Sequence, residues 1–256
     1  MILFDTHCHL DTDSFQQDRQ AVLARMHDSG VVGAAVIAYD ALSMESVTAF
    51  AASDPAFIAA VGVHPEYADT FSLHVLETMR RLSQAPQVRA IGEIGLDTHD
   101  PNGIAMQIQR QTLEAQLDLA EEVSLPVVFH VRGAHGAMLE ILRGRRAHLT
   151  GGIIHCFSGS WEMAQSYMDL GYLIALGGAA TYENARRART VMERIPLDRL
   201  VLETDSPYMP PEGHRGERNE PANLLMICQR LAQIRGIAPE QLAEKTTENA
   251  RKLYGL

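Results

Sequence analysis

Eight short apolar segments recur along this 256-residue chain and limit the folds that it can adopt. Each segment is rich in β-branched residues and has the length of a strand that is buried on both faces. They lie near residues 2–6, 31–38, 57–63, 88–94, 126–131, 152–156, 172–177 and 199–204. Segments with helical periodicity lie between them, so the sequence predicts a regular alternation of strands and helices.

Eight strands that alternate with helices over about 250 residues are typical of a (β/α)8 barrel. A doubly wound open sheet is the alternative arrangement. Pro239 is a good first residue for an additional C-terminal helix, which we expect to reach about Leu253. No Pro/Gly/Ser-rich linker or internal repeat divides the sequence. We therefore expect an α/β protein in which residues 1–256 form a single TIM-barrel domain with an extra C-terminal helix.

Composition narrows the function classes. The net charge of −10 argues against a protein that grips nucleic acid by bulk electrostatics. The longest apolar runs fall short of 18 residues, and the N-terminus does not resemble a signal peptide. The three cysteines, Cys8, Cys156 and Cys228, are scattered and odd in number, which favours a reducing compartment. We expect a cytoplasmic protein with no membrane partner and no obligate protein partner.

Polar residues occur where the predicted strands end, and barrels of this class place their chemistry at the C-terminal ends of the strands. Most are metal-ligand types. They are His7 and His9 at the end of the first segment, His64 after the third, Glu93 at the end of the fourth, His130 and Arg132 at the end of the fifth, His155 at the end of the sixth, and Glu203 and Asp205 at the end of the eighth. Strand alternation is expected to aim His7 and His9 along one face, and Glu203 and Asp205 along one face as well.

Each of these residues alone has a common structural role, such as a hydrogen-bonded core histidine, a buried acid or a turn cap. Four imidazoles and two carboxylates at five strand ends are hard to obtain by chance and predict a metal centre. They exceed the needs of one zinc ion and suit two divalent ions with a bridging carboxylate. The only lysines, Lys245 and Lys252, lie in the terminal helix, which excludes a carboxylated lysine as the bridge. Glu93 is the natural bridge.

Six motifs together resemble the TatD-type metal-dependent hydrolases, the TatD DNase family within the amidohydrolase superfamily. They are "DTHCHLD", "GVHP", "GEIGLD", "HVR", "HCFSG" and "LETDSP", and they occur in the expected order over almost the whole chain. The segment "PYMPPEGHRGERNEPAN" resembles the YjjV-like branch of the family. The resemblance implies that His7, His9 and Asp205 hold one ion, that His130 and His155 hold a second, and that Glu93 bridges both. It also implies substrate contacts by His64, Phe157 and Ser158, to which we add Arg132 as a phosphate contact.

The family is described as metal-dependent deoxyribonucleases. We therefore expect a binuclear hydrolase that uses zinc, magnesium or manganese to activate water, with Asp205 and Glu93 as catalytic residues, and cleaves phosphodiester bonds near an end of single-stranded DNA. Two alternatives remain: a metal-dependent ester or amide hydrolase such as a D-aminoacyl-tRNA deacylase, and a non-catalytic metal-binding barrel. The segment after Asp97, "THDPNGIAMQIQRQ", lacks the aromatic and basic residues that are common there in the family.

Overall fold

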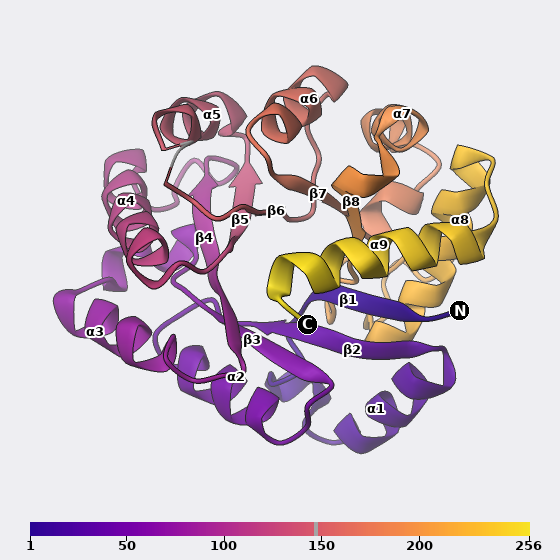
Figure 1. Cartoon of the computed structure of the whole chain (residues 1–256), viewed down its shortest axis with the longest axis horizontal. Coiled ribbons are helices and arrows are strands. Elements are labelled where there is room, and N and C mark those ends of the chain that lie inside the picture. The colour runs from indigo at the N-terminus through magenta and orange to yellow at the C-terminus, as the bar shows by residue number, and fades with distance from the viewer. Residues whose placement is uncertain (146–147) are drawn as a thin grey trace. The chain divides into compact units, whose positions relative to one another are not determined.

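The computed structural model describes residues 1–145 and 148–256 and confirms the predicted alternation of strands and helices (Figure 1). Within these ranges the strands are β1 (Leu3–Cys8), β2 (Val31–Ile37), β3 (Phe57–Val61), β4 (Val88–Asp97), β5 (Val127–Arg132), β6 (Gly152–Ile154), β7 (Leu173–Leu176) and β8 (Leu200–Leu202). They form one sheet in the order β1-β2-β3-β4-β5-β6-β7-β8. This sequential order is that of a (β/α)8 barrel, since a doubly wound sheet reverses its strand order partway.

The helices also agree with the sequence periodicity. In the described ranges they are α1 (Arg19–Asp28), α2 (Ser43–Ala52), α3 (Leu73–Leu82), α4 (Met106–Val123), α5 (His135–Gly144), α6 (Trp161–Asp169), α7 (Arg186–Arg194), α8 (Leu224–Arg235) and α9 (Pro239–Tyr254). Helix α9 is the predicted additional C-terminal helix, and it begins at Pro239 as expected. Within the described ranges, every helix is too short or too polar to cross a membrane.

The described residues group into two compact units by their contacts. Unit 1 comprises Met1–Val36, Cys156–Gln165 and Leu173–Leu256, and unit 2 comprises Ile37–His155 and Ser166–Tyr172. The expectation of a single domain over the whole chain stays a prediction.

In unit 1, helix α9 is hydrogen-bonded to β1 and β8, the strands that lead to His7, His9 and Asp205. It runs alongside β1 (Figure 1), and the Tyr254 hydroxyl donates a hydrogen bond of 3.1 Å to the carbonyl oxygen of Thr6 in that strand. The Asn249 side-chain amide donates to the carbonyl oxygen of Leu200 in β8 (2.8 Å). Both β1 and β8 are fully buried. The extra helix therefore fixes the positions from which the first group of candidate ligands extends.

In unit 2, strands β4 and β5 pair in parallel, and they approach so closely that one position accepts only glycine. Gly95 is the partner of His130 in the pairing of these strands. A Cβ atom added at Gly95 would lie 1.8 Å from the His130 carbonyl oxygen, which is far inside van der Waals contact. The absence of a side chain at Gly95 therefore permits the spacing between Glu93 on β4 and His130 on β5.

We predict that Gly95→Ala lowers the free energy of unfolding by about 1–3 kcal/mol or more, because the added methyl group must push these strands apart. Urea titration followed by circular dichroism measures the change. The matched control is Gly136→Ala in α5, where an added Cβ meets nothing within 4 Å; there the helix should gain about 0.5–1 kcal/mol. Equal stabilities for the two variants would contradict the close approach.

Candidate metal centre

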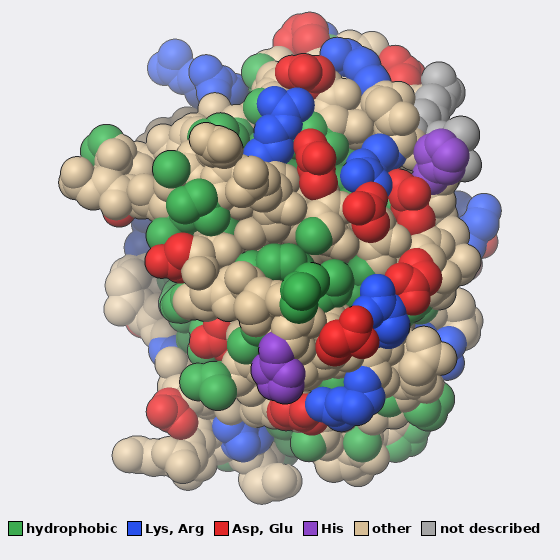
Figure 2. Space-filling view, turned by 90° about the vertical axis from the view of Figure 1, so that its left-hand side faces the viewer, with side chains coloured by type: hydrophobic (Ala, Val, Ile, Leu, Met, Phe, Trp, Pro, Cys, Tyr) green, Lys and Arg blue, Asp and Glu red, His purple; other side chains and the backbone are tan. Residues whose placement is uncertain are grey.

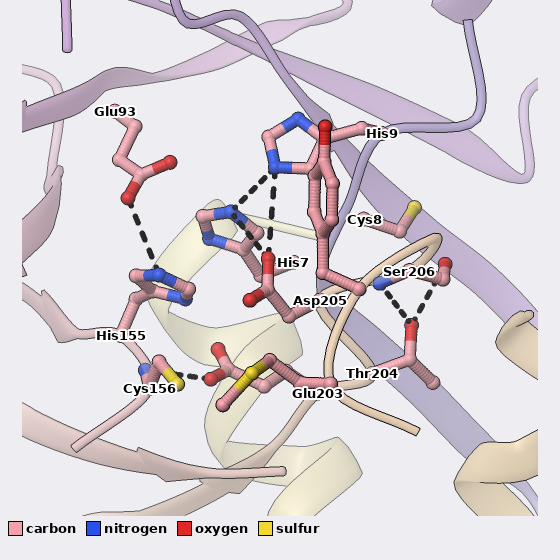
Figure 3. Close-up of polar contacts among 12 residues, drawn as sticks. His7, Cys8, His9, Glu93, His155, Cys156, Glu203, Thr204, Asp205 and Ser206 are labelled. Carbon is pink, nitrogen blue, oxygen red and sulfur yellow. Dashed lines mark hydrogen bonds and ion pairs between the residues drawn. The ribbon is translucent and has the colours of Figure 1, made fainter. Parts of the chain in front are cut away.

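Three ligand-type side chains converge in unit 1. The Nε2 atoms of His7 and His9 lie 3.3 Å apart, and Asp205 Oδ1 lies 3.7 Å from the first and 3.6 Å from the second (Figure 3). Both histidines are buried, with exposures of 0% and 5%. His7 lies in β1 and His9 directly follows its last residue, and their rings come together as the alternation predicted. The backbone N–H of Asp205 donates to the His7 carbonyl oxygen (2.8 Å), which brings the carboxylate to the two rings.

This donor set fits a divalent cation. Zinc–nitrogen bonds of about 2.0–2.1 Å at tetrahedral angles separate two ligand atoms by about 3.3–3.4 Å, close to the spacing of the two Nε2 atoms. Imidazole nitrogens and a carboxylate oxygen that face one another at such distances repel unless a proton or a cation lies between them. The residues His7, His9 and Asp205 therefore present a geometry and a chemistry that suit a bound metal ion.

A buried carboxylate beneath this group holds it in place. Asp5 is fully buried, and it accepts hydrogen bonds from the backbone N–H (2.9 Å) and the hydroxyl (2.5 Å) of Thr204. The Thr204 hydroxyl oxygen in turn accepts from the N–H of Ser206 (3.2 Å; Figure 3). Burial raises the pKa of Asp5 to about 7, although the hydrogen bonds from Thr204 partly offset this rise. Asp5 thus links the residues before His7 to those on either side of Asp205.

In unit 2, one carboxylate oxygen is shared by three histidines. Glu93 Oε1 lies 2.9 Å from His130 Nδ1, 3.2 Å from His155 Nε2 and 3.6 Å from His64 Nε2. Glu93 is 3% exposed, so the shared oxygen lies in a buried environment. Glu93 and His130 lie on β4 and β5, His155 directly follows β6, and His64 is the third residue after β3. The structure thus brings together four residues that the sequence analysis singled out.

His130 has a second carboxylate partner, Asp97, whose Oδ2 lies 2.8 Å from Nε2. A neutral imidazole has one N–H; if Nε2 donates to Asp97, the Nδ1 lone pair faces Glu93 and needs a proton or a metal ion. Burial lowers the pKa of His130, but the carboxylates of Asp97 and Glu93 outweigh it and raise the pKa overall. A carboxylate that fixes the tautomer of a metal-binding histidine is a recurrent feature of metal sites.

His64 is buried and is held from its other side. Its Nδ1 accepts a hydrogen bond from the N–H of Glu66 (3.2 Å) at the start of the 3-10 turn Pro65–Thr70. In the neutral ring, Nε2 then carries the proton and lies on the side of Glu93. Burial lowers the pKa of His64 to about 4, so the neutral form prevails near pH 7. His64 is therefore available as a hydrogen-bond donor beside the cluster.

The other sequence-predicted residues differ in exposure. Arg132 ends β5 and is exposed, and Ser158 is exposed as well. Phe157 is 4% exposed, and its N–H donates to the Ala175 carbonyl oxygen (3.2 Å). Cys8 lies on the opposite side of β1 from the histidines, with its thiol 3.3 Å from the Ala35 carbonyl oxygen (Figure 3).

Glu203 and Asp205 follow strand β8 and have different partners. Strand β8 ends at Leu202, and Asp205 has a left-handed backbone with φ 58°. Asp205 turns toward His7 and His9, whereas the buried Glu203 accepts a hydrogen bond from the N–H of Cys156 (2.6 Å; Figure 3). Strict alternation therefore does not extend to these residues, and the expectation of a common face stays a prediction.

Sequence reasoning missed Asp5 and Asp97. Each has a signal in hindsight: Asp5 is an acid inside an apolar strand, and Asp97 is on the same face of β4 as Glu93 by alternation. The partners that give them a role, Thr204 and His130, are distant in sequence.

We predict that Asp97→Ala weakens metal binding by about 10–100-fold, the usual cost of removing a carboxylate that orients a ligating histidine. Calorimetric titration of metal-depleted protein with zinc or manganese measures the change. Asp100→Asn is the matched control, because Asp100 is an exposed acid that caps the N–H of Asn102. An unchanged affinity in Asp97→Ala would show that Asp97 does not position His130.

Comparison with known proteins identifies the family of this chain. The family model described as "TatD related DNase" matches residues 4–255. The chain is 36% identical over 260 residues to a Pantoea vagans protein named 3'-5' ssDNA/RNA exonuclease TatD, covering 99% of this chain and 100% of that protein. It is 35% identical over 253 residues to YabD of Bacillus subtilis, named as an uncharacterized metal-dependent hydrolase, with 99% of each chain covered.

The fold of this chain also matches that of a solved structure. The crystal structure of the Escherichia coli TatD homologue YjjV superposes with a TM-score of 0.93 at 34% identity, covering 99% of this chain and 98% of that one. The expected resemblance to the YjjV-like branch is therefore matched by a solved structure. The chain belongs to the TatD family of metal-dependent hydrolases.

Proposed function

We propose that this protein removes nucleotides from an end of single-stranded nucleic acid by metal-dependent hydrolysis of phosphodiester bonds. The observation that carries the proposal is the convergence of His7, His9 and Asp205 on one position in unit 1. The relatives named 3'-5' ssDNA/RNA exonuclease support attack from the 3' end. We place the protein's substrates among single-stranded DNA and RNA for the same reason.

We propose two ions per chain. His7, His9 and Asp205 would hold the first ion, His130 and His155 would hold the second, and Glu93 would be the ligand available to both. The imidazole-rich donor set suits zinc, while the shared carboxylate also accepts magnesium or manganese. When bound, the ions supply positive charge that polarises the phosphodiester and acidifies water.

The chain's own groups perform the remaining tasks. Asp205 accepts a proton from the attacking water as general base and orients it, since its carboxylate is the part of the first cluster that is half-buried rather than buried. The Nε2–H of His64 donates a hydrogen bond to a non-bridging phosphate oxygen. Arg132 contacts a phosphate from the end of β5, and Phe157 and Ser158 shape the substrate side.

The surface charge supports a substrate that is held locally rather than along a basic track. Acidic and basic side chains are mixed on the face that carries α3 and α4 (Figure 2). Ion pairs there include Arg80 with Glu122 (2.8 Å). With a net charge of −10, the protein should engage few phosphates at once. The salt dependence of binding is therefore expected to match about one to three phosphates.

One observation favours a second candidate function, hydrolysis of an aminoacyl ester. A cavity of about 340 Å³ in unit 2 is lined by the carboxylates Glu66, Asp97 and Asp100 and the amides Asn102 and Gln109. An acidic lining attracts an ammonium group and repels a phosphate. A D-aminoacyl-tRNA is a substrate that combines such an ammonium group with an ester bond.

End-labelled oligonucleotides distinguish the two. Metal-loaded protein is incubated with single-stranded DNA, single-stranded RNA, duplex DNA and D-aminoacyl-tRNA, each with zinc, magnesium or manganese, and product lengths are followed over time. We expect stepwise shortening of single strands from the 3' end and poor cleavage of the duplex. Intact oligonucleotides with every ion, together with rapid release of the amino acid, would refute the nuclease proposal and support the ester hydrolase.

Asp205→Asn is predicted to lower the rate of oligonucleotide cleavage by about 10²–10⁴-fold, the usual contribution of a general base, while the oligonucleotide still binds. Single-turnover cleavage and fluorescence anisotropy measure the two quantities. Asp28→Asn, at an exposed acid that ends α1, is the control. Near-full activity of Asp205→Asn would assign the base to another group, of which Glu203 is the first to test.

A further inference from the structure

Tyr208 is the most exposed aromatic side chain in the part of the chain that the structure describes, at 57%. Its ring nevertheless lies beside a candidate metal ligand. The ring centroids of Tyr208 and His9 are 5.9 Å apart, with an interplanar angle of 67°. Large aromatic side chains elsewhere, such as Tyr167 and Phe129, are fully buried. An exposed ring next to the His7–His9–Asp205 group therefore requires an explanation.

The backbone around Tyr208 is held rigidly. The Tyr208 N–H donates to the Asp205 carbonyl oxygen (2.8 Å), and the Tyr208 carbonyl oxygen accepts from the side-chain amide of Asn219 (2.7 Å). Asn219 is fully buried, and it also donates to the Thr204 carbonyl oxygen (2.8 Å). The exposed ring is thus mounted on a fixed backbone, and a ligand that stacks on it pays little entropy for ordering the loop.

The backbone of Met209, the next residue, is also held in place by its neighbours. Met209 has a left-handed backbone with φ 51°, a conformation that costs energy in a residue other than glycine. A Cβ atom added at Gly178 would lie 1.9 Å from the Met209 carbonyl oxygen, so the loop backbone rests directly on this glycine. The conformation of the segment is determined by its neighbours even though its aromatic side chain is exposed to solvent.

The segment that follows Tyr208 carries a cation, Arg215, which stacks on another aromatic ring. The Arg215 guanidinium lies over the Tyr182 ring, 4.2 Å from its centroid. The Tyr182 hydroxyl donates to the carbonyl oxygen of Pro210 (2.8 Å), two residues beyond Tyr208. Stacking on an aromatic face restrains a guanidinium and leaves its N–H groups at the edges for an anion. The loop therefore combines an exposed π-face with an oriented cation.

We propose that Tyr208 is a stacking platform for a nucleobase that flanks the scissile phosphate, and that Arg215 contacts a phosphate of the same strand. This subsite rests on the proposed nuclease function and specifies how it recognises a single strand. Every base has a π-face, so stacking binds a strand without selecting its sequence. It also requires an unpaired base, which disfavours a duplex.

Abasic substrates test the stacking contact directly. The 5'-labelled single strands carry an abasic residue at the last, the penultimate or an interior position, or none. Wild type, Tyr208→Ala, Tyr208→Phe and the control Leu73→Ala, at an 81% exposed apolar residue that begins α3, are assayed for kcat/KM and for bound metal.

For wild type, we expect an abasic residue at the last or the penultimate position to lower kcat/KM by about 10-fold, and an interior one to have no effect. In Tyr208→Ala, kcat/KM on the intact strand should fall by a similar factor. An abasic residue at the position that matters in wild type should lower it no further, and the metal content should be unchanged. Tyr208→Phe and Leu73→Ala should behave like wild type, because the ring and not the hydroxyl makes the contact.

Three results would overturn the subsite while leaving the nuclease proposal intact. They are an abasic penalty in Tyr208→Ala as large as in wild type, a loss in Tyr208→Phe equal to that in Tyr208→Ala, and a loss of metal from Tyr208→Ala, which would make the ring a support for His9. Wild-type protein that cleaves no oligonucleotide would instead overturn the nuclease proposal and the subsite with it.

Discussion

Mutual repulsion among buried electron-rich atoms is the constraint on which this structure depends. His7, His9 and Asp205 bring two imidazole nitrogens and a carboxylate oxygen within 3.7 Å of one another. Side chains in such an arrangement separate unless a proton or cation lies between them or the backbone holds them together. Here the backbone contributes through the Asp205–His7 hydrogen bond and the buried Asp5–Thr204 contact beneath it. Helix α9 forms hydrogen bonds with both β1 and β8 and so helps to hold His7, His9 and Asp205 together.

In the group around Glu93, repulsion between carboxylates is relieved by an imidazole ring that lies between them. His130 lies between Glu93 and Asp97, at 2.9 and 2.8 Å. The two carboxylates favour a positive charge at the ring, which explains why the pKa of His130 is raised although its ring is largely buried. A divalent ion held by Nδ1 in place of the proton would supply positive charge there, and Nε2–H could still donate to Asp97. The arrangement that keeps the imidazole charged thus also prepares it as a ligand.

Sequence patterns predicted the parts of this protein that depend on local rules. Apolar runs marked the strands, and ligand-type residues at their ends predicted which side chains would gather, because parallel strands in a barrel share one C-terminal edge. The carboxylates that hold the candidate ligands in place, Asp5 and Asp97, could not be predicted from such patterns. Asp5 acts through Thr204, which is 199 positions away, and Asp97 acts through His130, so their roles exist only in three dimensions. The left-handed turn at Asp205 also escaped prediction, since non-glycine residues rarely adopt it.

We propose that the His7–His9–Asp205 and Glu93–His130–His155 groups together hold two divalent ions. Elemental analysis of protein that is purified without chelator, reloaded with metal and freed of excess ion measures this most directly. Our account predicts a value that approaches two ions per chain and falls toward one when His7 and His9 are both replaced by alanine. A firm value of one ion at saturating metal, unchanged by those replacements, would contradict it.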